Sequence, residues 1–330
     1  MSKVLITGGA GFFGVHLARC LLNNGYKVDL VDNFSRGVND DELKSLSAKS
    51  GVCILNRDLL QPGVLDDLDN NYKYIYHFAA IIGVVNVIDR PYHVLRDNVS
   101  MLVNMLSFAE HQSSLQRFVF TSTSEVYAGT LQHFTMPIPT PESTPLALTA
   151  LDHPRTSYML SKIYGEALCH HSGVPFTIIR PHNIYGPRMG MAHVIPELLK
   201  KAHCASDGAR LDVFSVNHWR TFCYIDDTVM MMKLAAESSA CMEETLNIGN
   251  QEPEISIGEL ARLILDIVGK NLEISEKPAT PGSPLRRCPD MTRTIELTGY
   301  NSQVDLHKGL ELTYDWYRTN VFEGKVVYAK

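Results

Sequence analysis

Short apolar runs alternate with amphipathic segments along the first 180 residues of the chain. The runs lie at 4–6, 28–32, 52–56, 74–80, 117–122 and 176–181. Longer segments such as NVSMLVNMLSFAEH, at 98–111, instead repeat their apolar residues at helical spacing. Strands that alternate with helices are typical of a parallel sheet covered by helices on both faces. We therefore predict an α/β fold with a Rossmann-type, doubly wound parallel sheet.

The pattern becomes irregular and richer in Pro and Gly after Pro181. The segment ATPGSPLRRCPD, at 279–290, has the composition of a loop rather than of a linker between independent domains. We expect this part of the chain to form a smaller C-terminal lobe attached to the sheet.

Composition and charge narrow the class of protein. The chain has 330 residues, 45% of them hydrophobic, which is enough for a large core. It carries 30 Lys and Arg against 36 Asp and Glu, so its net charge is −6. No basic stripe is present that would neutralise a nucleic-acid backbone. We expect no nucleic-acid partner.

The sequence shows no membrane or metal signature. It starts MSKVLITGG, which is a strand pattern rather than a signal peptide, and its longest apolar stretch, FAAIIGVVNVI, is too short to cross a bilayer. We therefore expect a cytoplasmic protein without a membrane partner. The seven cysteines form no C-x-x-C pair, and the 13 histidines show no H-E-x-x-H spacing. We expect neither disulfides nor a metal.

A glycine-rich turn follows the first predicted strand. Gly8 permits a tight turn, Gly11 lets a pyrophosphate approach the backbone, and Gly14 lets the next helix pack on the sheet. The second strand ends at Asp32, where a carboxylate can accept hydrogen bonds from an adenosine ribose. Asp32 would repel the 2′-phosphate of NADP and favours NAD, although the nearby Arg36 leaves NADP open.

Tyr158 and Lys162, in SYMLSK, stand four residues apart and therefore share one face of a helix. A free tyrosine has a pKa of about 10, too high for a base at neutral pH. We expect the Lys162 ammonium, together with a positive nicotinamide ring, to lower the pKa of Tyr158. This spacing occurs together with the glycine turn and the hydroxyl-rich segment TSTSEVY, at 121–127, so chance is a poor explanation for it.

These motifs resemble the extended short-chain dehydrogenase/reductase family, and within it the sugar-nucleotide epimerases, dehydratases and decarboxylases. The resemblance covers nearly the whole chain and rests on TGGAGFFG, Asp58-Leu59, HFAA at 77–80, Asn98, TSTSEVY, SYMLSK, RPHNIYGPRMG, RTFCYIDD and RRCPD. It implies an NAD-binding Rossmann domain at 1–180 plus about 219–246. It also implies a nucleotide-sugar-binding lobe at about 181–218 and 247–330.

The resemblance also assigns roles to residues. Tyr158 would remove a proton from the C4 hydroxyl of a hexose, Lys162 would bind the nicotinamide ribose, and Thr123 would hydrogen-bond the reacting hydroxyl. NAD would lie among Gly8, Gly11, Phe12, Phe13, Gly14, Asp32, Asn33, Ser35, Arg36, Asp58, Leu59, Ala79, Ala80, Asn98, Thr121, Tyr158, Lys162 and Pro181.

The resemblance implies phosphate-binding residues after Pro181 and a dimer interface formed by the long helices. Asn183 would meet the phosphates of a nucleotide-diphosphate sugar, and Arg220 and Arg287 would neutralise them, since guanidinium groups suit phosphate oxygens. Arg287 is preferred here over its neighbour Arg286. The helices around 98–111 and 157–171 resemble those of a four-helix dimer interface, although their apolar spacing would equally suit packing on the sheet. We expect a homodimer.

Glu125 bears on which reaction follows C4 oxidation. In the family, Thr123-Ser124-Glu125 resembles both decarboxylases of UDP-glucuronate and GDP-mannose dehydratases, in which this carboxylate would act after oxidation. The segment RPHNIYGPRMGMAHVIPEL is more similar to epimerases, which need no such group. We therefore expect net C4 epimerisation, with 4,6-dehydration or decarboxylation using Glu125 as the alternative. Ser124, beside it, is a further candidate catalytic residue. A simple dehydrogenase is a further alternative.

Overall fold

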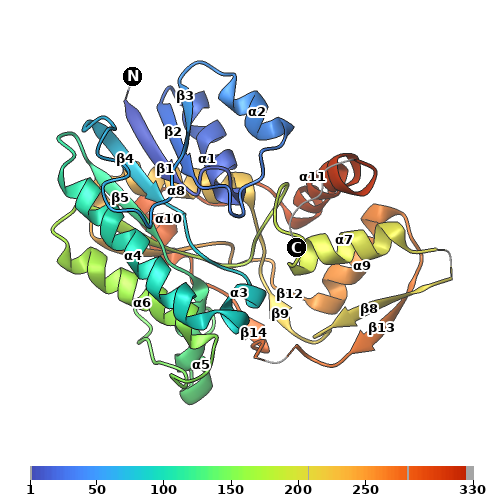
Figure 1. The fold of residues 1–330 in the computed structure, drawn as a ribbon. Coiled ribbons are helices and arrows are strands. Elements are labelled where there is room, and N and C mark those ends of the chain that lie inside the picture. The colour runs from blue at the N-terminus through green and yellow to red at the C-terminus, as the bar shows by residue number, and fades with distance from the viewer. Residues whose placement is uncertain (1, 207, 281, 325–330) are drawn as a thin grey trace.

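A seven-stranded parallel sheet forms the centre of the protein (Figure 1). The structure, a computed structural model, describes residues 2–206, 208–280 and 282–324. The strand order is β11-β6-β5-β4-β1-β2-β3. The strands span Lys3–Thr7 (β1), Lys27–Asp32 (β2), Val52–Asn56 (β3), Tyr72–His77 (β4), Arg117–Thr121 (β5), Phe176–Pro181 (β6) and Glu244–Ile248 (β11). The order changes direction between β1 and β4, where open α/β sheets bind their ligands.

Two layers of helices cover the sheet. On one face, α1 (Phe12–Asn23) packs against α8 (Ile225–Glu237); on the other, α4 (Pro91–Glu110) packs against α6 (Thr156–His171). Within β1, Val4 and Ile6 belong to the first hydrophobic core and Leu5 to the second. Because both faces are buried, the strands are continuous apolar runs, and the predicted Rossmann-type fold is confirmed.

Shorter elements complete this part of the molecule. The short strand-like end of the predicted run 74–80 is a loop, because β4 stops at His77 and the apolar Phe78, Ala79 and Ala80 follow outside the sheet. The remaining helices are α2 (Asp41–Ser47), α3 (Val84–Asp89), η1 (Ser124–Tyr127), α5 (Ala128–His133), η2 (Ser239–Cys241) and α10 (Thr292–Thr298).

The smaller lobe lies beyond the carboxyl ends of the strands and is built from two separate parts of the chain (Figure 1). Its helices are α7 (Val194–Cys204), α9 (Ile257–Val268) and α11 (Leu306–Tyr317), followed by η3 (Arg318–Phe322). Its strands are β8 (Arg210–Phe214) beside β13 (Glu273–Lys277), and β9 (Trp219–Arg220) between β12 (Ile255–Ser256) and β14 (Arg286–Arg287). The short pair β7 (Ile184–Tyr185) and β10 (Cys223–Tyr224) joins the lobe to the sheet.

Local sequence explains where the best-defined of these helices starts and stops. Helix α9 begins with a capping box, in which the Ser256 side chain accepts from the Glu259 backbone N–H and the Glu259 carboxylate accepts from the Ser256 N–H. It ends at Gly269, whose φ of 73° suits glycine at a helix C-terminus. None of the helices in the described ranges combines the length and the apolar character needed to cross a membrane.

Candidate active site

The glycine turn between β1 and α1 is packed so tightly that side chains are excluded from it. Gly8 has a φ of +67°, and a Cβ on it would lie 2.9 Å from the backbone nitrogen of Ala79. A Cβ on Gly14 would lie 2.5 Å from the carbonyl oxygen of Gly8, so the helix rests directly on the turn. A Cβ on Gly11 would meet just one described atom, the Gly8 oxygen at 3.1 Å. The space in front of Gly11 is therefore free for a ligand that touches backbone.

Asp32 sits at the carboxyl end of β2, beside this turn. Its carboxylate accepts hydrogen bonds from the backbone N–H groups of Ala10 at 3.0 Å and Phe34 at 2.8 Å. Burial raises the pKa of Asp32, and these two donors oppose the rise. In the loop that follows, the Asn33 side chain accepts from the Ser35 N–H at 3.0 Å. The carboxylate is thus held in place at the edge where an adenosine ribose was expected.

Arg36 lies in the loop that follows Asp32. Its charge acts on Tyr158 and opposes the rise in the pKa of that group. From the sequence, Arg36 is expected to affect the choice between NAD and NADP. Its electrostatic influence on Tyr158 links residues 122 positions apart, which local sequence does not reveal.

The loops after β3 and β4 bring the next group of expected cofactor residues to the same edge. The Asp58 carboxylate accepts from the Leu60 N–H at 3.1 Å and shapes the turn that contains Leu59. Asn98, on α4, accepts from the Ile81 N–H at 2.7 Å and donates to the Ile81 carbonyl at 3.1 Å. These two bonds hold the loop that carries Ala79 and Ala80.

The remaining expected cofactor residues border the same space. Phe12 and Phe13 form the first turn of α1, and the Phe13 ring packs edge-on against Phe78. Thr121 ends β5 and Pro181 ends β6. The buried Thr121 hydroxyl has no hydrogen-bond partner within the described part of the chain. It is available to a ligand in this crevice.

Tyr158 and Lys162 project from one face of α6, as their spacing predicted. The Lys162 ammonium is 4% exposed, donates to the Thr121 carbonyl at 2.8 Å and lies 5.8 Å from the centre of the Tyr158 ring. Burial lowers the pKa of Lys162 to about 8. Burial and the Glu125 carboxylate raise the pKa of Tyr158, while a hydrogen bond with Thr123 and the charge of Arg36 oppose the rise. From protein groups alone, the direction is opposite to the lowered pKa that we expected for Tyr158.

Thr123, Ser124 and Glu125 lie where β5 passes into η1. The Thr123 hydroxyl accepts from the Glu125 backbone N–H at 3.2 Å, which fixes the start of the turn. Ser124 is buried, whereas the Glu125 side chain is exposed to a large cavity. One residue earlier, Ser122 donates to Glu166 at 2.5 Å, and Glu166 forms a buried ion pair with Arg180 at 2.6 Å. Through Ser122 and Arg180, Glu166 thus links α6 to the carboxyl ends of β5 and β6.

A cavity of about 860 Å³ lies between the sheet and the smaller lobe. This volume suits a ligand the size of a nucleotide-diphosphate sugar. Five residues singled out from the sequence line it, namely Ser124, Glu125, Asn183, Arg220 and Arg287. The structure thus joins the hydroxyl–carboxylate cluster and the expected phosphate-binding residues in one space, although more than 150 positions separate Glu125 from Arg287.

Arg220 and Arg287 face each other across paired strands, β9 and β14. Burial and the charge of Arg287 lower the pKa of Arg220 to about 10. Among the described residues, neither guanidinium forms an ion pair; Arg220 donates to Ser283 Oγ at 2.9 Å and to the Pro284 carbonyl at 2.8 Å. Like charges in directly opposed positions are unfavourable, so this arrangement favours an anionic ligand.

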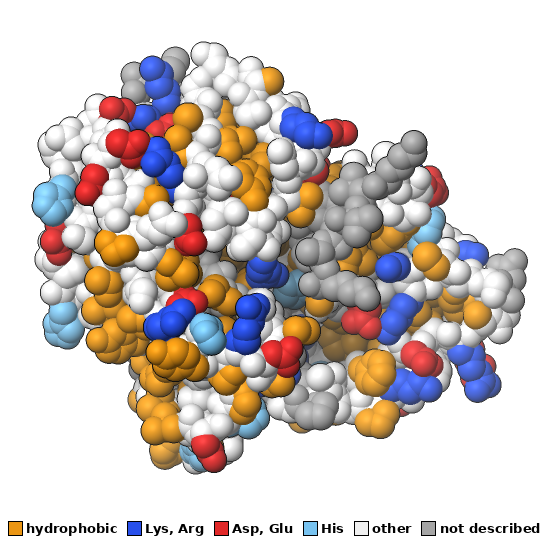
Figure 2. Space-filling view, in the orientation of Figure 1, with side chains coloured by type: hydrophobic (Ala, Val, Ile, Leu, Met, Phe, Trp, Pro, Cys, Tyr) orange, Lys and Arg blue, Asp and Glu red, His pale blue; other side chains and the backbone are white. Residues whose placement is uncertain are grey.

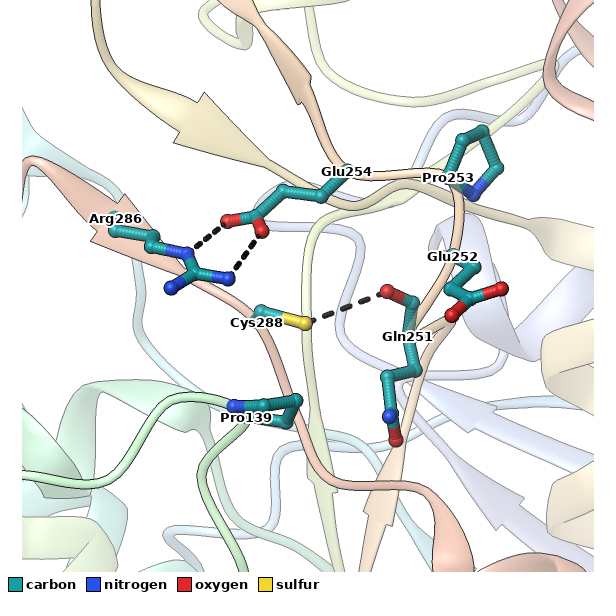
Figure 3. Close-up of a pocket in the computed structure, with 7 residues that line it drawn as sticks. All are labelled: Pro139, Gln251, Glu252, Pro253, Glu254, Arg286 and Cys288. Atoms are coloured by element: carbon teal, nitrogen blue, oxygen red, sulfur yellow. Dashed lines mark hydrogen bonds and ion pairs between the residues drawn. The ribbon is translucent and has the colours of Figure 1, made fainter.

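The neighbouring Arg286 is engaged elsewhere, as Figure 3 shows. Its Nε and Nη2 donate to the two carboxylate oxygens of Glu254, each at 2.7 Å, in a side pocket of about 580 Å³ that also contains Cys288. Side chains alternate along a strand, so Arg287 points away from this pocket. Its charge interacts with Glu125 instead. This geometry supports the preference for Arg287 over Arg286.

Among the other residues that line the cavity are two with ionisable or polar side chains that sequence analysis did not single out, Arg155 and His182. His182 donates through Nε2 to Asn247 Oδ1 at 3.0 Å, because the Asn247 amide already donates to the Thr140 and Asp290 carbonyls. Burial and the charge of Arg287 lower the pKa of His182 to about 3, so it is neutral. Their positions in the sequence could have identified them, because His182 precedes Asn183 and Arg155 stands one helical turn before Tyr158.

Comparison with known proteins identifies the family. A model of the NAD dependent epimerase/dehydratase family matches residues 4–249, which is most of the chain. The protein belongs to this family. It is therefore an NAD-dependent enzyme of the extended short-chain dehydrogenase/reductase type, and our predictions of family, enzyme class and cofactor are confirmed.

Named relatives of this epimerase/dehydratase family cover nearly the whole length of the chain. The UDP-N-acetyl-alpha-D-glucosaminuronate decarboxylase of Bacillus cytotoxicus is 31% identical in an alignment 331 positions long, which covers 96% of this chain and 98% of that protein. UDP-glucuronic acid decarboxylase 1 of Xenopus tropicalis is 31% identical over 328 residues, covering 96% of this chain and 72% of that protein.

Solved structures of family members share the fold. A UDP-glucuronic acid 4-epimerase from Bacillus cereus, in complex with UDP-glucuronic acid and NAD, matches with a TM-score of 0.79 and 27% identity, over 96% of this chain and 99% of that one. A UDP-glucose 4-epimerase from Thermotoga maritima, with UDP-glucose, matches with a TM-score of 0.81 and 26% identity, over 96% and 98% of the two chains.

The residues at the sheet edge fit the family's cofactor. The glycine turn leaves backbone accessible at Gly11, Asp32 is fixed at the end of β2, and the Thr121 hydroxyl is left without a partner in the described residues. These are the groups that would contact a pyrophosphate and its two riboses. The observed donors and acceptors therefore agree with NAD.

Proposed function

We propose that the protein decarboxylates a nucleotide-linked hexuronate after transient oxidation of the sugar at C4. From the sequence we expected net C4 epimerisation, with decarboxylation as an alternative. The relatives at 30–31% identity that span 96–97% of this chain are named as decarboxylases of UDP-glucuronic acid and of UDP-N-acetylglucosaminuronate, which favours the alternative. Their names also support uridine diphosphate as the carrier.

The observation that carries the proposal is the position of Glu125. Its carboxylate acts both on Tyr158, whose pKa it helps to raise, and on Arg287 across the cavity. A C4 epimerase needs only a group that exchanges a proton with the C4 oxygen, and Tyr158 suffices for that. A second proton-transfer group next to Tyr158 is what chemistry at C5 requires.

Tyr158, Thr123 and Lys162 would perform the first step. Tyr158 takes the proton of the C4 hydroxyl, and Thr123 hydrogen-bonds the same oxygen. The Lys162 ammonium, fixed by the Thr121 carbonyl, stabilises the phenolate by its charge. NAD, when bound, would supply an acceptor for the C4 hydride and the means of returning it. The sugar is then a C4 ketone.

Glu125 and Tyr158 would share the second step. A 4-keto hexuronate is a β-keto acid, so its C5–C6 bond breaks, carbon dioxide leaves, and the electron pair moves to the C4 oxygen as an enolate. Tyr158 and Thr123 hydrogen-bond that oxygen. Glu125 delivers a proton taken from solvent to C5, which restores the C4 ketone. Tyr158 would then return its proton to the C4 oxygen as the bound cofactor restored the hydride at C4, which would give the nucleotide-linked pentose.

We also propose that the protein forms a homodimer through α4 and α6. Tyr92 and Val103 on α4 and Tyr164 on α6 are 67%, 47% and 50% exposed. Figure 2 shows apolar side chains gathered over this region. Large apolar patches on a folded surface mark interaction sites. The two helices of each chain would together make a four-helix interface, in line with the resemblance found in the sequence.

The proposed reaction is tested by product analysis. The purified protein is incubated, with and without added NAD, with UDP-glucuronate, UDP-N-acetylglucosaminuronate, UDP-glucose or UDP-galactose, and the products are followed by mass spectrometry and NMR. We expect loss of carbon dioxide from a hexuronate and retention of the nucleotide. A product of unchanged mass with inverted C4 would instead establish epimerisation, and loss of water would establish dehydration.

A further inference from the structure

Three guanidinium groups that have no carboxylate partner among the described residues surround one segment of the smaller lobe, residues 282–287. Arg220 donates to Ser283 and Pro284 in this segment, and Arg287 belongs to it. Arg155 approaches it from the opposite wall: a Cβ on Gly282 would lie 3.2 Å from Arg155 Nη1. Arg155 stands immediately before α6, so its side chain reaches across the cavity from the catalytic helix.

Other cations on the cavity wall already have partners. Lys201 pairs with Glu197 at 2.6 Å, and Arg286 pairs with Glu254. Within the described ranges, the Arg155 guanidinium forms no ion pair or hydrogen bond, although the side chain is half-buried. A partly desolvated guanidinium without an acceptor is unfavourable, and an anionic ligand group would relieve this.

The position of Arg155 separates it from the pair Arg220 and Arg287. Those two come from opposed strands of the smaller lobe, where we expect the diphosphate. Arg155 lies three residues before Tyr158, on the same side of α6. Tyr158 meets the C4 oxygen in the proposed reaction, and C6 of the sugar is two bonds from C4. A group held next to Tyr158 is therefore placed to reach a substituent on C6.

We propose that Arg155 binds the C6 carboxylate of the nucleotide-linked hexuronate and thereby selects it over the corresponding neutral hexose. This inference rests on the proposed function for the identity of the substrate. The guanidinium provides two parallel N–H donors, which match the two oxygens of a carboxylate. A neutral CH₂OH at C6 would leave the guanidinium without a charged partner.

The test compares ligand affinities rather than turnover. Dissociation constants for UDP, UDP-glucose and UDP-glucuronate are measured by calorimetry with the wild type, Arg155→Met and Arg155→Lys. Charged hydrogen bonds of this kind support a preference of about tenfold or more. We expect Arg155→Met to lose at least that preference for UDP-glucuronate over UDP-glucose while binding UDP as the wild type does. Arg155→Lys should recover part of it.

Arg210→Met serves as the matched control, because Arg210 is exposed and pairs with Glu273 away from this segment. It should leave all three affinities unchanged. An equal loss of affinity for all three ligands in Arg155→Met would assign Arg155 to the phosphates and overturn the proposal, as would an unchanged preference. Should Arg155→Met fail to fold, Arg155→Lys decides by the same comparison. This binding test is independent of the product analysis described above. If UDP-glucuronate is preferred in an Arg155-dependent way but the product analysis shows no release of carbon dioxide, only the proposed reaction is contradicted.

Discussion

At the scale of single residues, Glu125 is the side chain whose chemistry separates the possible reactions. We expect Glu125→Gln to oxidise C4 and release carbon dioxide in the first turnover, but to form the pentose product about 10²–10⁴-fold more slowly, as is usual when a general acid or base is removed. Reduced cofactor should then accumulate in the NADH absorption band. The control is Glu276→Gln, at an exposed position of the smaller lobe. Unchanged formation of the pentose product by Glu125→Gln would show that this carboxylate takes no part.

Lys162 predicts a pH dependence of stability. Its pKa is lowered from 10.5 to about 8 by burial, so between these values the unfolded chain binds more protons than the folded one. Stability attributable to Lys162 therefore rises with pH in that window. Relative to Lys162→Met, the wild type should gain about 2 kcal/mol between pH 8 and pH 10, measured by chemical denaturation without ligands. The exposed Lys200→Met should show no such trend, and a flat difference for Lys162→Met would refute the prediction.

Residue-level chemistry was predictable from the sequence where it depends on spacing along the chain. Tyr158 and Lys162 share a helix face because they stand four residues apart, and Asp32 is marked by the end of a strand. The positions of Arg36 and Arg155 were not predictable. Arg36 acts electrostatically on a residue 122 positions away, and Arg155 lies beside a loop of the other lobe, so neither relation leaves a local pattern.

At the scale of elements, the close contact between α1 and the glycine turn is the feature most sensitive to substitution. In Gly14→Ala, the new methyl group would lie 2.5 Å from the Gly8 oxygen and 2.6 Å from the Gly9 oxygen. We expect a loss of about 1–3 kcal/mol in unfolding free energy and a smaller fraction of bound NAD. Gly190→Ala is the control, since its nearest neighbour would be 3.8 Å away. Thermal unfolding and the NAD content of purified protein measure both effects.

Longer helices and strands could be predicted from the sequence more readily than short ones. Six of the seven strands of the main sheet coincide with predicted apolar runs, whereas β11, at Glu244–Ile248, was not predicted. Strands β9, β12 and β14 have two residues each, too few to show any periodicity. Their partners are set by tertiary contacts, so the register that opposes Arg220 and Arg287 required the structure.

At the scale of the whole molecule, the proposed dimer predicts a change of mass in solution. Val103→Glu places a charge in the centre of the apolar surface on α4, and burying that charge would be costly. We expect light scattering to show two chains per particle for the wild type and one for Val103→Glu. Ile295→Glu is the control, because Ile295 is 36% exposed on α10, which packs with α8 on the other face of the sheet. A monomeric wild type, or a dimeric Val103→Glu, would contradict the interface.

The order of elements also has a consequence for synthesis. Strand β11, at Glu244–Ile248, is the edge strand beside β6, yet the chain builds α7, β8 and β9 of the smaller lobe before reaching it. Helix α8, which packs against α1, arrives just before β11. A chain still growing on the ribosome therefore holds an unfinished sheet, with an open edge at β6 and one face covered by α1 but not yet by α8, until about 250 residues have emerged. Chaperone binding to the nascent chain should be concentrated in this interval.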